Sequence, residues 1–258
     1  MSRFVTHIIL VSLATVIQPV FAQQILPNFT AHYSLSKGPI NFGTTIRKII
    51  RVDEKHFLFK SVTIPKGIAT IFTEGEVTEQ SKWIVHNESI RPIEYSYVNT
   101  ASKKKRDVKL LFDWQTQTVT NIINGDPWKM ELSIGTQDKL VYQLSVMLDL
   151  AKQKKDLEYL VADGGKLKTY TIKISGEELI ETPLGTFKTT KVTRTGKNRT
   201  TVLWCAHDLH YLPIKIEQSK DTGNVVATLF KLEGIKIPAS VKSKTNTPKM
   251  EDLGENSD

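Results

Sequence analysis

The sequence predicts a mainly β protein: one large, curved antiparallel sheet with one amphipathic helix. Three observations support this fold class. Short segments rich in β-branched and aromatic residues follow one another from Phe29 to Ile235, turn-forming residues separate them, and only one stretch has helical periodicity. About 10–12 strands fit this length, which favours a half-barrel or open barrel.

The strands are predicted most firmly where two segments flank a turn. Residues 108–114 and 118–123 are separated by three polar residues, so we expect them to pair as a hairpin. A second hairpin is expected around Asp163-Gly164-Gly165-Lys166, with strands at 157–161 and 167–175. Further strands are expected at residues 46–52, 93–97, 187–194, 200–206, 213–219 and 225–232.

Residues 136–152 are predicted to form the helix. Thr136 is expected to cap its start, and Asp138 is expected in the first turn, where a carboxylate interacts favourably with the helix dipole. An apolar stripe at helical spacing is made of Leu140, Leu144, Met147, Leu148 and Ala151. We expect this stripe to pack on the sheet, with a partner or a lipid as the alternative.

The chain is expected to divide into a signal peptide at residues 1–22, a single β-rich domain at 23–238 and a disordered polar tail at 239–258. Arg3 precedes an apolar run that ends in compact residues at Ala22, as in secretory signal peptides. An uncleaved anchor is the alternative, although the run is short for a membrane span. Gln23, where a lipoprotein would have cysteine, predicts a soluble periplasmic product. The tail has no periodic apolar residues, so it cannot bury enough apolar surface to offset the entropy lost when a chain becomes ordered.

The charge balance is moderately basic. Lysine and arginine number 35 against 27 aspartate and glutamate residues, which gives a net charge of +8. Cleavage after Ala22 would remove Arg3 and no acidic residue, leaving +7. This excess favours anionic partners, or it serves solubility alone. We expect no nucleic acid partner for an exported protein. The single cysteine, Cys205, excludes an internal disulfide and a thiolate metal cage.

Nucleophile-elbow, phosphate-loop and zinc-helix motifs are all missing from the sequence, so we expect no enzyme, no catalytic residue, no metal and no cofactor. Hydrolase-type activity stays open through two arrangements. Cys205 and His207 would share a strand face as a nucleophile and its base, and Glu74 with Glu76 would supply an acid and a base. The simpler interpretations are a buried core cysteine and, for the sequence cluster Glu74, Glu76 and Glu79, a polar strand face on which Glu74 and Glu76 lie together.

Two other polar clusters also have simple interpretations. The pair His207 and His210 lacks a third donor, so we interpret it as part of a solvated loop rather than a metal site. The basic run at residues 103–106 is interpreted as a charged hairpin loop rather than an anion site.

Aromatic residues in or beside the predicted strands are the best candidates for a ligand site. A curved antiparallel sheet often leaves a concave apolar face, which suits acyl chains. The candidate ligand-binding residues are Phe57, Phe59, Tyr95, Tyr97, Trp114, Trp128 and Tyr170. The alternative is that these side chains, together with Trp83, form the hydrophobic core.

An ordered series of short segments resembles a known bacterial family. The segments are Phe112-Asp113-Trp114, Asn124-Gly125-Asp126-Pro127-Trp128, residues 138–144, residues 161–170, residues 182–187 and Tyr211-Leu212-Pro213-Ile214. Together they resemble the exported family catalogued as domain of unknown function 3108, over residues 31–234. The resemblance implies a periplasmic protein of a Gram-negative bacterium and a fold similar to the half-barrels of lipoprotein carriers. It implies no activity and no catalytic residues.

We therefore expect a soluble periplasmic protein that binds an apolar or amphiphilic envelope ligand, such as a lipid or the acyl chain of a lipoprotein, without catalysis. The alternative is an envelope assembly or protein-interaction module that binds another envelope protein through a sheet edge or the tail.

Overall fold

The computed structural model describes residues 26–67, 70, 75–101, 106–220 and 223–241. The predicted signal peptide, Glu74, the basic residues 103–105 and the tail from residue 242 lie outside the described residues. Within the described part of the chain, no helix has the length and apolar character needed to cross a bilayer.

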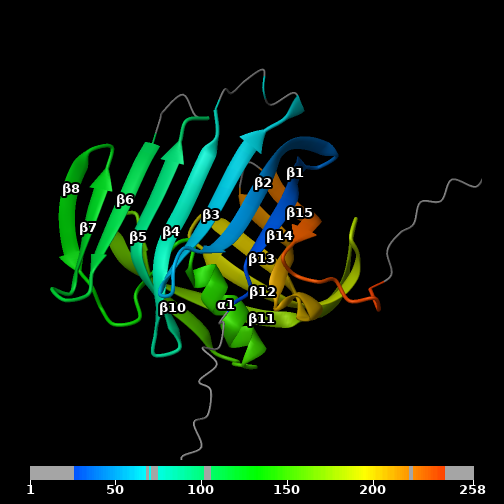
Figure 1. Cartoon of the computed structure of the whole chain (residues 1–258). Coiled ribbons are helices and arrows are strands. Elements are labelled where there is room, and N and C mark those ends of the chain that lie inside the picture. Colours follow the sequence, from blue (N-terminus) through cyan, green and yellow to red (C-terminus); the bar gives the residue numbers. More distant parts are fainter. Residues whose placement is uncertain (1–25, 68–69, 71–74, 102–105, 221–222, 242–258) are drawn as a thin grey trace, which may run out of the picture.

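The described residues form fifteen strands, one α-helix and a short 3-10 helix (Figure 1). In chain order these are β1 (Phe29–Lys37), β2 (Ile40–Arg51), β3 (His56–Pro65), β4 (Val77–His86), β5 (Ser89–Asn99), β6 (Arg106–Asp113), β7 (Thr118–Ile123), β8 (Asp126–Glu131), β9 (Gln137–Asp138), α1 (Tyr142–Ala151), β10 (Leu157–Asp163), β11 (Lys166–Thr182), β12 (Gly185–Gly196), β13 (Arg199–Ala206), η2 (His207–Leu209), β14 (Leu212–Lys220) and β15 (Gly223–Glu233).

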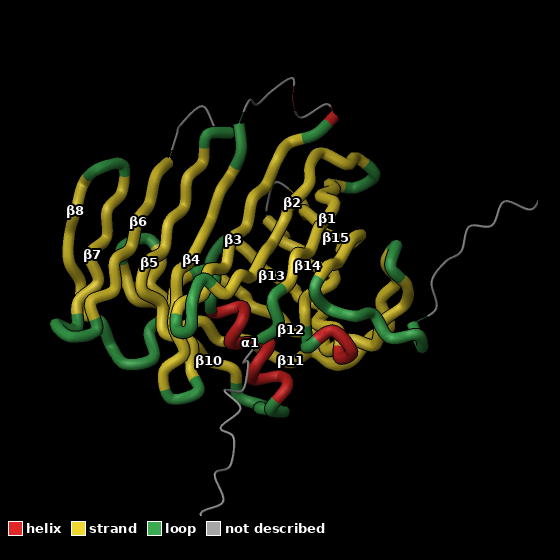
Figure 2. The backbone as a smooth tube through the Cα atoms, viewed as in Figure 1, coloured by secondary structure: helices red, strands yellow, loops and turns green. Residues whose placement is uncertain are grey.

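All of these strands belong to one sheet, in the order β8-β7-β6-β5-β4-β3-β2-β1-β15-β14-β13-β12-β11-β10-β9. Neighbouring strands are antiparallel, except that the two-residue β9 runs parallel to β10. The first strand pairs with the last, so the two halves of the meander are continuous. The sheet bends so that β2–β8 and β10–β14 form two walls, with α1 between them (Figures 1 and 2).

The predicted fold class is therefore confirmed: mainly β, one large curved sheet and a single α-helix among the described residues. The strand number is higher than the 10–12 expected. Two of the strands missed by the count carry no alternating pattern: β8 is largely exposed along its length, and β9 has only two residues. Both hairpins, at β6–β7 and β10–β11, form as predicted.

Buried and more exposed residues alternate along the strands, so the sheet has an inner face and an outer face. In β1 the residues Phe29, Ala31, Tyr33 and Leu35 are buried, while the residues between them are half-exposed. Cross-strand register extends such positions into rows on the inner face. One row consists of Phe29, Ile49, Phe59, Ser81, Tyr95, Leu110, Asn121 and Trp128.

The helix is shorter and more buried than the sequence predicted. It begins at Tyr142 rather than near Thr136, and its burial extends to both sides of the expected stripe, with Tyr142, Ser145 and Val146 buried. Thr136 bonds the carbonyl of Ser133 instead of capping the helix. The prediction assumed a helix with one face exposed to solvent. Because α1 lies between two walls of the sheet, residues outside the apolar stripe are buried as well.

A contact between Trp128 and Gly165 joins the two ends of the curved sheet. Trp128 lies on the edge strand β8, and Gly165 lies in the turn between β10 and β11, near the opposite edge. A Cβ atom at Gly165 would overlap the indole ring, so the ring packs directly on the glycine backbone. The φ of Gly165 is also positive, at +76°. The contact thus requires glycine for two separate reasons.

We predict that Gly165→Ala destabilises the protein by about 1–3 kcal/mol more than Gly164→Ala, because only the first substitution adds overlap with Trp128 to the strain of a positive φ. Gly164 is the matched control, since its φ is +63° and a Cβ there meets only the Lys168 ammonium at 3.8 Å. Urea unfolding measures both changes.

In the Trp128→Ala background the excess cost of Gly165→Ala should disappear, because the partner of the overlap is gone. An equal cost for the two glycine substitutions in the wild-type background would show that the indole contact does not hold the ends of the sheet together.

Candidate functional site

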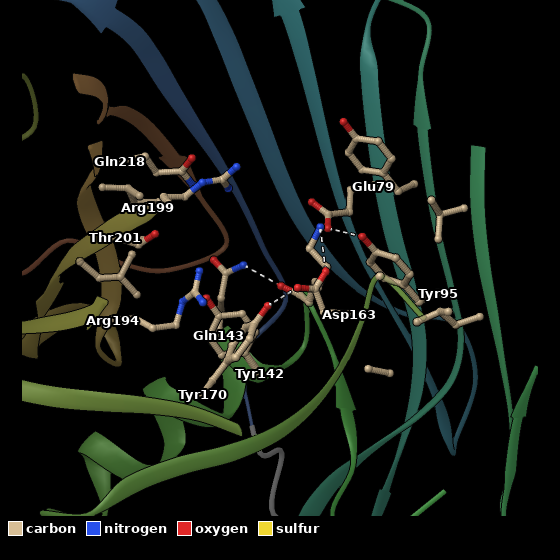
Figure 3. A pocket seen from close by; sticks show the side chains of 18 of the residues that line it. Glu79, Tyr95, Tyr142, Gln143, Asp163, Tyr170, Arg194, Arg199, Thr201 and Gln218 are labelled. Carbon is tan, nitrogen blue, oxygen red and sulfur yellow. Dashed lines mark hydrogen bonds and ion pairs between the residues drawn. The ribbon is translucent and has the colours of Figure 1, made fainter. Parts of the chain in front are cut away.

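A cavity of about 310 Å³ lies inside the bend of the sheet (Figure 3). Its lining comes from both walls and from the segment that leads into α1. Among the described residues, five cationic side chains and two carboxylates line it, so the lining has an excess of positive charge. These charged residues are Arg47, Arg106, Lys139, Arg194, Arg199, Glu79 and Asp163.

One side of the cavity carries a cross-strand row of hydrogen-bond donors. Arg194 on β12 pairs in register with Thr201 on β13, which pairs with Gln218 on β14. Arg199 is two residues before Thr201 on the same strand and therefore shares its face. Figure 3 shows these four side chains together, with Glu79 and Tyr95 across from them.

The donors of this row are incompletely used within the protein. Thr201 is 6% exposed, and its hydroxyl has no hydrogen-bond partner. The Nε atom of Arg194 is likewise buried without a partner, while the guanidinium stacks 4.1 Å from the ring centre of Tyr170. Buried polar groups are normally paired, so a hydroxyl and a guanidinium Nε without a partner on the lining of one cavity are unusual.

Arg47 enters the cavity from β2. Its Nη1 donates to Oε1 of Gln143 on α1 over 2.9 Å, and its Nε is buried without a partner. The guanidinium also lies 5.6 Å from the ring centre of Tyr33. Arg47 therefore contributes positive charge to the lining of the cavity, and its hydrogen bond with Gln143 connects β2 to the helix.

The two carboxylates of the lining are already engaged. Glu79 accepts a 2.5 Å hydrogen bond from the hydroxyl of Tyr95. Asp163 accepts bonds from Lys168 at 2.8 Å and from Tyr170 at 3.0 Å. Burial opposes ionisation of Asp163, but the Lys168 hydrogen bond and the positive charge of Lys139 outweigh it and lower its pKa. Asp163 therefore stays a carboxylate that neutralises lysines at the rim.

Two further cavities adjoin the first. The larger, about 780 Å³, shares Lys139, Asp163, Tyr170, Arg194 and Arg199 with it and adds Lys168 and Lys197. The smaller, about 230 Å³, shares Arg47, Glu79, Ile216 and Gln218 and adds apolar Leu35, Val225 and Ala227 together with Tyr33, Thr45, Ser61 and Thr63. The concave face thus changes from a basic region at one end to a region of mixed apolar and hydroxyl side chains at the other.

A buried carboxyl positions the segment that lines the floor of the cavity. Oδ1 of Asp138 accepts the backbone N–H groups of Leu140 at 2.8 Å and Val141 at 2.9 Å, and Oδ2 accepts the hydroxyl of Ser81 on β4 at 2.5 Å. Desolvation by burial outweighs these bonds and raises the pKa of Asp138 to about 6. Asp138 thereby connects β4 to the start of α1, which carries Tyr142 and Gln143.

Comparison with known proteins places the chain in a family. The sequence model of the family described as "Protein of unknown function (DUF3108)" matches residues 28–229. The chain belongs to this family. A search among curated proteins found no match.

A solved structure shares the fold of this DUF3108 protein. It is described as the crystal structure of a β-barrel-like protein of domain of unknown function DUF1849 from Brucella abortus. The TM-score is 0.51 at 9% sequence identity, and the match covers 81% of this chain and 98% of that chain. At this identity the similarity concerns the fold alone, and it agrees with the predicted half-barrel.

The aromatic residues selected from the sequence divide between the cavity and other places. Tyr95, Tyr97 and Tyr170 line the cavity. Phe57 stacks on Trp83 at 4.4 Å, and Phe59 packs edge-on against Phe29, so both belong to the core instead. The Nε1 of Trp114 donates to the carbonyl of Pro92, and Trp128 packs on Gly165. Of the seven aromatics, the candidate site keeps the three tyrosines.

The groups considered for catalysis are not assembled as a site among the described residues. Cys205 is fully buried, and desolvation raises the pKa of its thiol far above the usual range. His207 makes its hydrogen bond with the hydroxyl of Thr190 over 2.8 Å, rather than with the thiol. Glu76 is exposed and accepts a bond from Thr78, whereas its neighbour Glu79 is the carboxylate that enters the cavity.

Sequence reasoning missed the arginines of the site, although the sequence contains a signal for them. Arg194 is in phase with the buried Val192 along β12, and Thr201 is in phase with Leu203 along β13. Arg47 is likewise in phase with Ile49, so it lies on the inner face of β2. A basic residue in phase with buried residues in the middle of a strand indicates a polar interior, whereas Arg51 has the same phase but lies exposed at the end of β2.

We predict that Asp138→Asn removes a pH dependence from stability. The native pKa of Asp138 is raised above the ordinary value of 3.8, so its contribution is fully present below pH 4 and is lost as pH rises through about 6. Relative to the variant, the wild type should lose about 2 kcal/mol of unfolding free energy between pH 4 and pH 7. Asparagine can accept the Leu140 and Val141 bonds, so the fold should persist.

Denaturant unfolding at several pH values checks this prediction. Glu76→Gln is the control, because Glu76 is exposed and its removal should leave the difference between pH 4 and pH 7 unchanged. Parallel pH profiles for the wild type and Asp138→Asn would contradict a raised pKa for the buried carboxyl.

Proposed function

We propose that this DUF3108 protein is a non-catalytic binding protein that holds an amphiphilic ligand, with an anionic end, in the concavity of its sheet. The observation that carries the proposal is the excess of cationic side chains in an interior cavity, four of them arginines without an ion pair within the described residues. These four are Arg47, Arg106, Arg194 and Arg199.

The electrostatics of the cavity support an anionic end. Unpaired charges in a partly desolvated interior are costly for the folded protein, so a counter-charge from a ligand stabilises it. The basic residues of the adjoining 780 Å³ cavity, including Lys168 and Lys197, would attract an anion toward the interior.

The apolar part of the ligand is supported by the other end of the concavity. Leu203 and Ile216 line the main cavity beside the polar row, and Leu35, Val225 and Ala227 line the 230 Å³ extension together with the hydroxyl side chains of Tyr33, Thr45, Ser61 and Thr63. Apolar side chains next to a few converging charged groups are the usual composition of a small-molecule site. An amphiphile fits this arrangement better than the purely apolar ligand that the sequence also allowed.

Export to the periplasm is part of the proposal. It rests on the signal-peptide features of residues 1–22 and on the resemblance named above. The ligand would then be an amphiphile of the cell envelope.

We predict that the mature protein, purified from a bacterial periplasm, carries an amphiphile that native mass spectrometry detects and organic extraction releases. Arg47→Gln should reduce the occupied fraction several-fold, because it removes a charge from the cavity. Arg51→Gln is the matched control on the same strand, since Arg51 is exposed, does not line the cavity, and donates its side-chain hydrogen bonds to the carbonyls of Asp53 and Glu54.

An empty protein in every preparation, or equal occupancy in the Arg47 and Arg51 variants, would count against a ligand site in the concavity. Circular dichroism of both variants establishes that the sheet is intact in each comparison.

A second candidate function is strand-mediated binding of another envelope protein. Strand β8 is the terminal strand on one side of the sheet. None of the described strands pairs with its outer backbone groups, which leaves them for a strand of a partner protein. Addition of a strand to such an edge is a common mode of protein recognition. Isolation of a partner that protects the β8 amides from hydrogen exchange, with no extracted ligand, would favour this function.

A further inference from the structure

We infer that the anionic group bound in the concavity is a phosphate ester, held by the row Arg194, Thr201 and Gln218 together with Arg199. This inference rests on the proposed function and adds the chemical class of the ligand's polar end. Three observations support it: the register of β12, β13 and β14, the hydrogen-bond donors without a partner, and the positive charge of the two arginines, which no carboxylate of the described residues pairs with.

The register brings the donors within reach of one small group. Arg194, Thr201 and Gln218 are direct cross-strand neighbours on β12, β13 and β14. Directly opposed residues of one sheet face have Cβ atoms about 4.5–5.5 Å apart. Arg199 extends the row along β13, at the junction between the main cavity and the basic 780 Å³ cavity.

The state of these side chains indicates that they serve a ligand rather than the fold. The hydroxyl of Thr201 is buried without a partner, although the side chain lines the cavity. The ion pairs of the described residues all have lysine or histidine as the cation, so neither Arg194 nor Arg199 takes part in one. In a purely structural row, the Thr201 hydroxyl and the Arg194 Nε would normally be paired.

The chemistry of the donors matches phosphate better than carboxylate. A phosphate monoester carries a charge of about −1.5 to −2 near neutral pH and three strongly accepting oxygens. Two guanidiniums match that charge and bind oxygen pairs, while the Thr201 hydroxyl and the Gln218 amide donate to what remains. A carboxylate has two oxygens and a single charge, so it would leave part of the row unused.

The same chemistry is present in a phosphorylated lipid and in a small phosphate ester without a chain. The experiment therefore compares three probes by titration calorimetry on the mature protein: dodecyl phosphate, dodecanoate and glycerol 3-phosphate, each below any micellar concentration. We expect dodecyl phosphate to bind at least tenfold more tightly than dodecanoate. We expect glycerol 3-phosphate to bind more weakly than dodecyl phosphate, because it lacks the apolar chain.

Variants connect the binding to the row. Arg194→Gln and Arg199→Gln should each weaken dodecyl phosphate about tenfold, since each removes a charge-assisted bond. Thr201→Val, which keeps the shape of the side chain, should weaken dodecyl phosphate and leave dodecanoate nearly unchanged. Lys215→Gln is the matched control: it removes one charge from β14 at a residue that lies over Trp204 and does not line the cavity.

The outcomes separate this inference from the proposed function. Equal affinity for dodecyl phosphate and dodecanoate, or no effect of Arg194→Gln and Arg199→Gln on phosphate binding, overturns the phosphate assignment while the amphiphile site stands. Glycerol 3-phosphate binding as tightly as dodecyl phosphate supports the phosphate assignment and overturns the amphiphile. Absence of binding by all three probes, in variants and wild type that melt normally, overturns both.

Discussion

The pairing of β1 with β15 is the interaction on which the rest of the structure depends. It joins the first strand to the last, with Ala31 opposite Leu232 and Leu35 opposite Ala227, and so makes one sheet from two halves of the chain. Just after β15, Gly234 approaches the backbone of Asn28 so closely that a Cβ atom would not fit. Such long-range pairing has a high entropic cost of loop closure, which burial of the inner face must offset.

Because the sheet is continuous, side chains from distant strands meet in its bend. Arg47 from the first half and Gln218 from the second line the same cavity, and the hydroxyl of Tyr33 on β1 donates to the carbonyl of Pro213 on β14. The contact of Trp128 with Gly165 joins the free ends of the sheet, and the Asp138–Ser81 bond fixes the helix inside it. The cavity therefore results from the bending of the whole sheet until its two ends meet, and no single strand or helix forms it.

The polar lining of the cavity contains some of the buried polar atoms without a partner in the described residues, and others lie elsewhere, on Trp83, Asn99, Asn121 and Gln137. Glu79 and Asp163 are paired, whereas atoms of Arg47, Arg194 and Thr201 are buried without partners. Unpaired buried donors reduce stability, and natural proteins keep them mainly where they have another use. Three such atoms, on Arg47, Arg194 and Thr201, border the same cavity, and this is the observation behind the proposed binding function. Desolvation raises the pKa of the buried Cys205 thiol, so this cysteine offers no ionised thiol.

The sequence by itself determined the β class, both hairpins, most strand positions and the family, because alternation and turn residues are local properties. It also placed Tyr95, Tyr97 and Tyr170 among the candidates, but it could not separate them from the core residues Phe57 and Phe59. Only the tertiary structure decided which inner-facing residues surround a cavity. The reason is physical: strand periodicity tells which side a residue faces, whereas register and curvature decide what lies opposite, as they do for Arg194, Thr201 and Gln218.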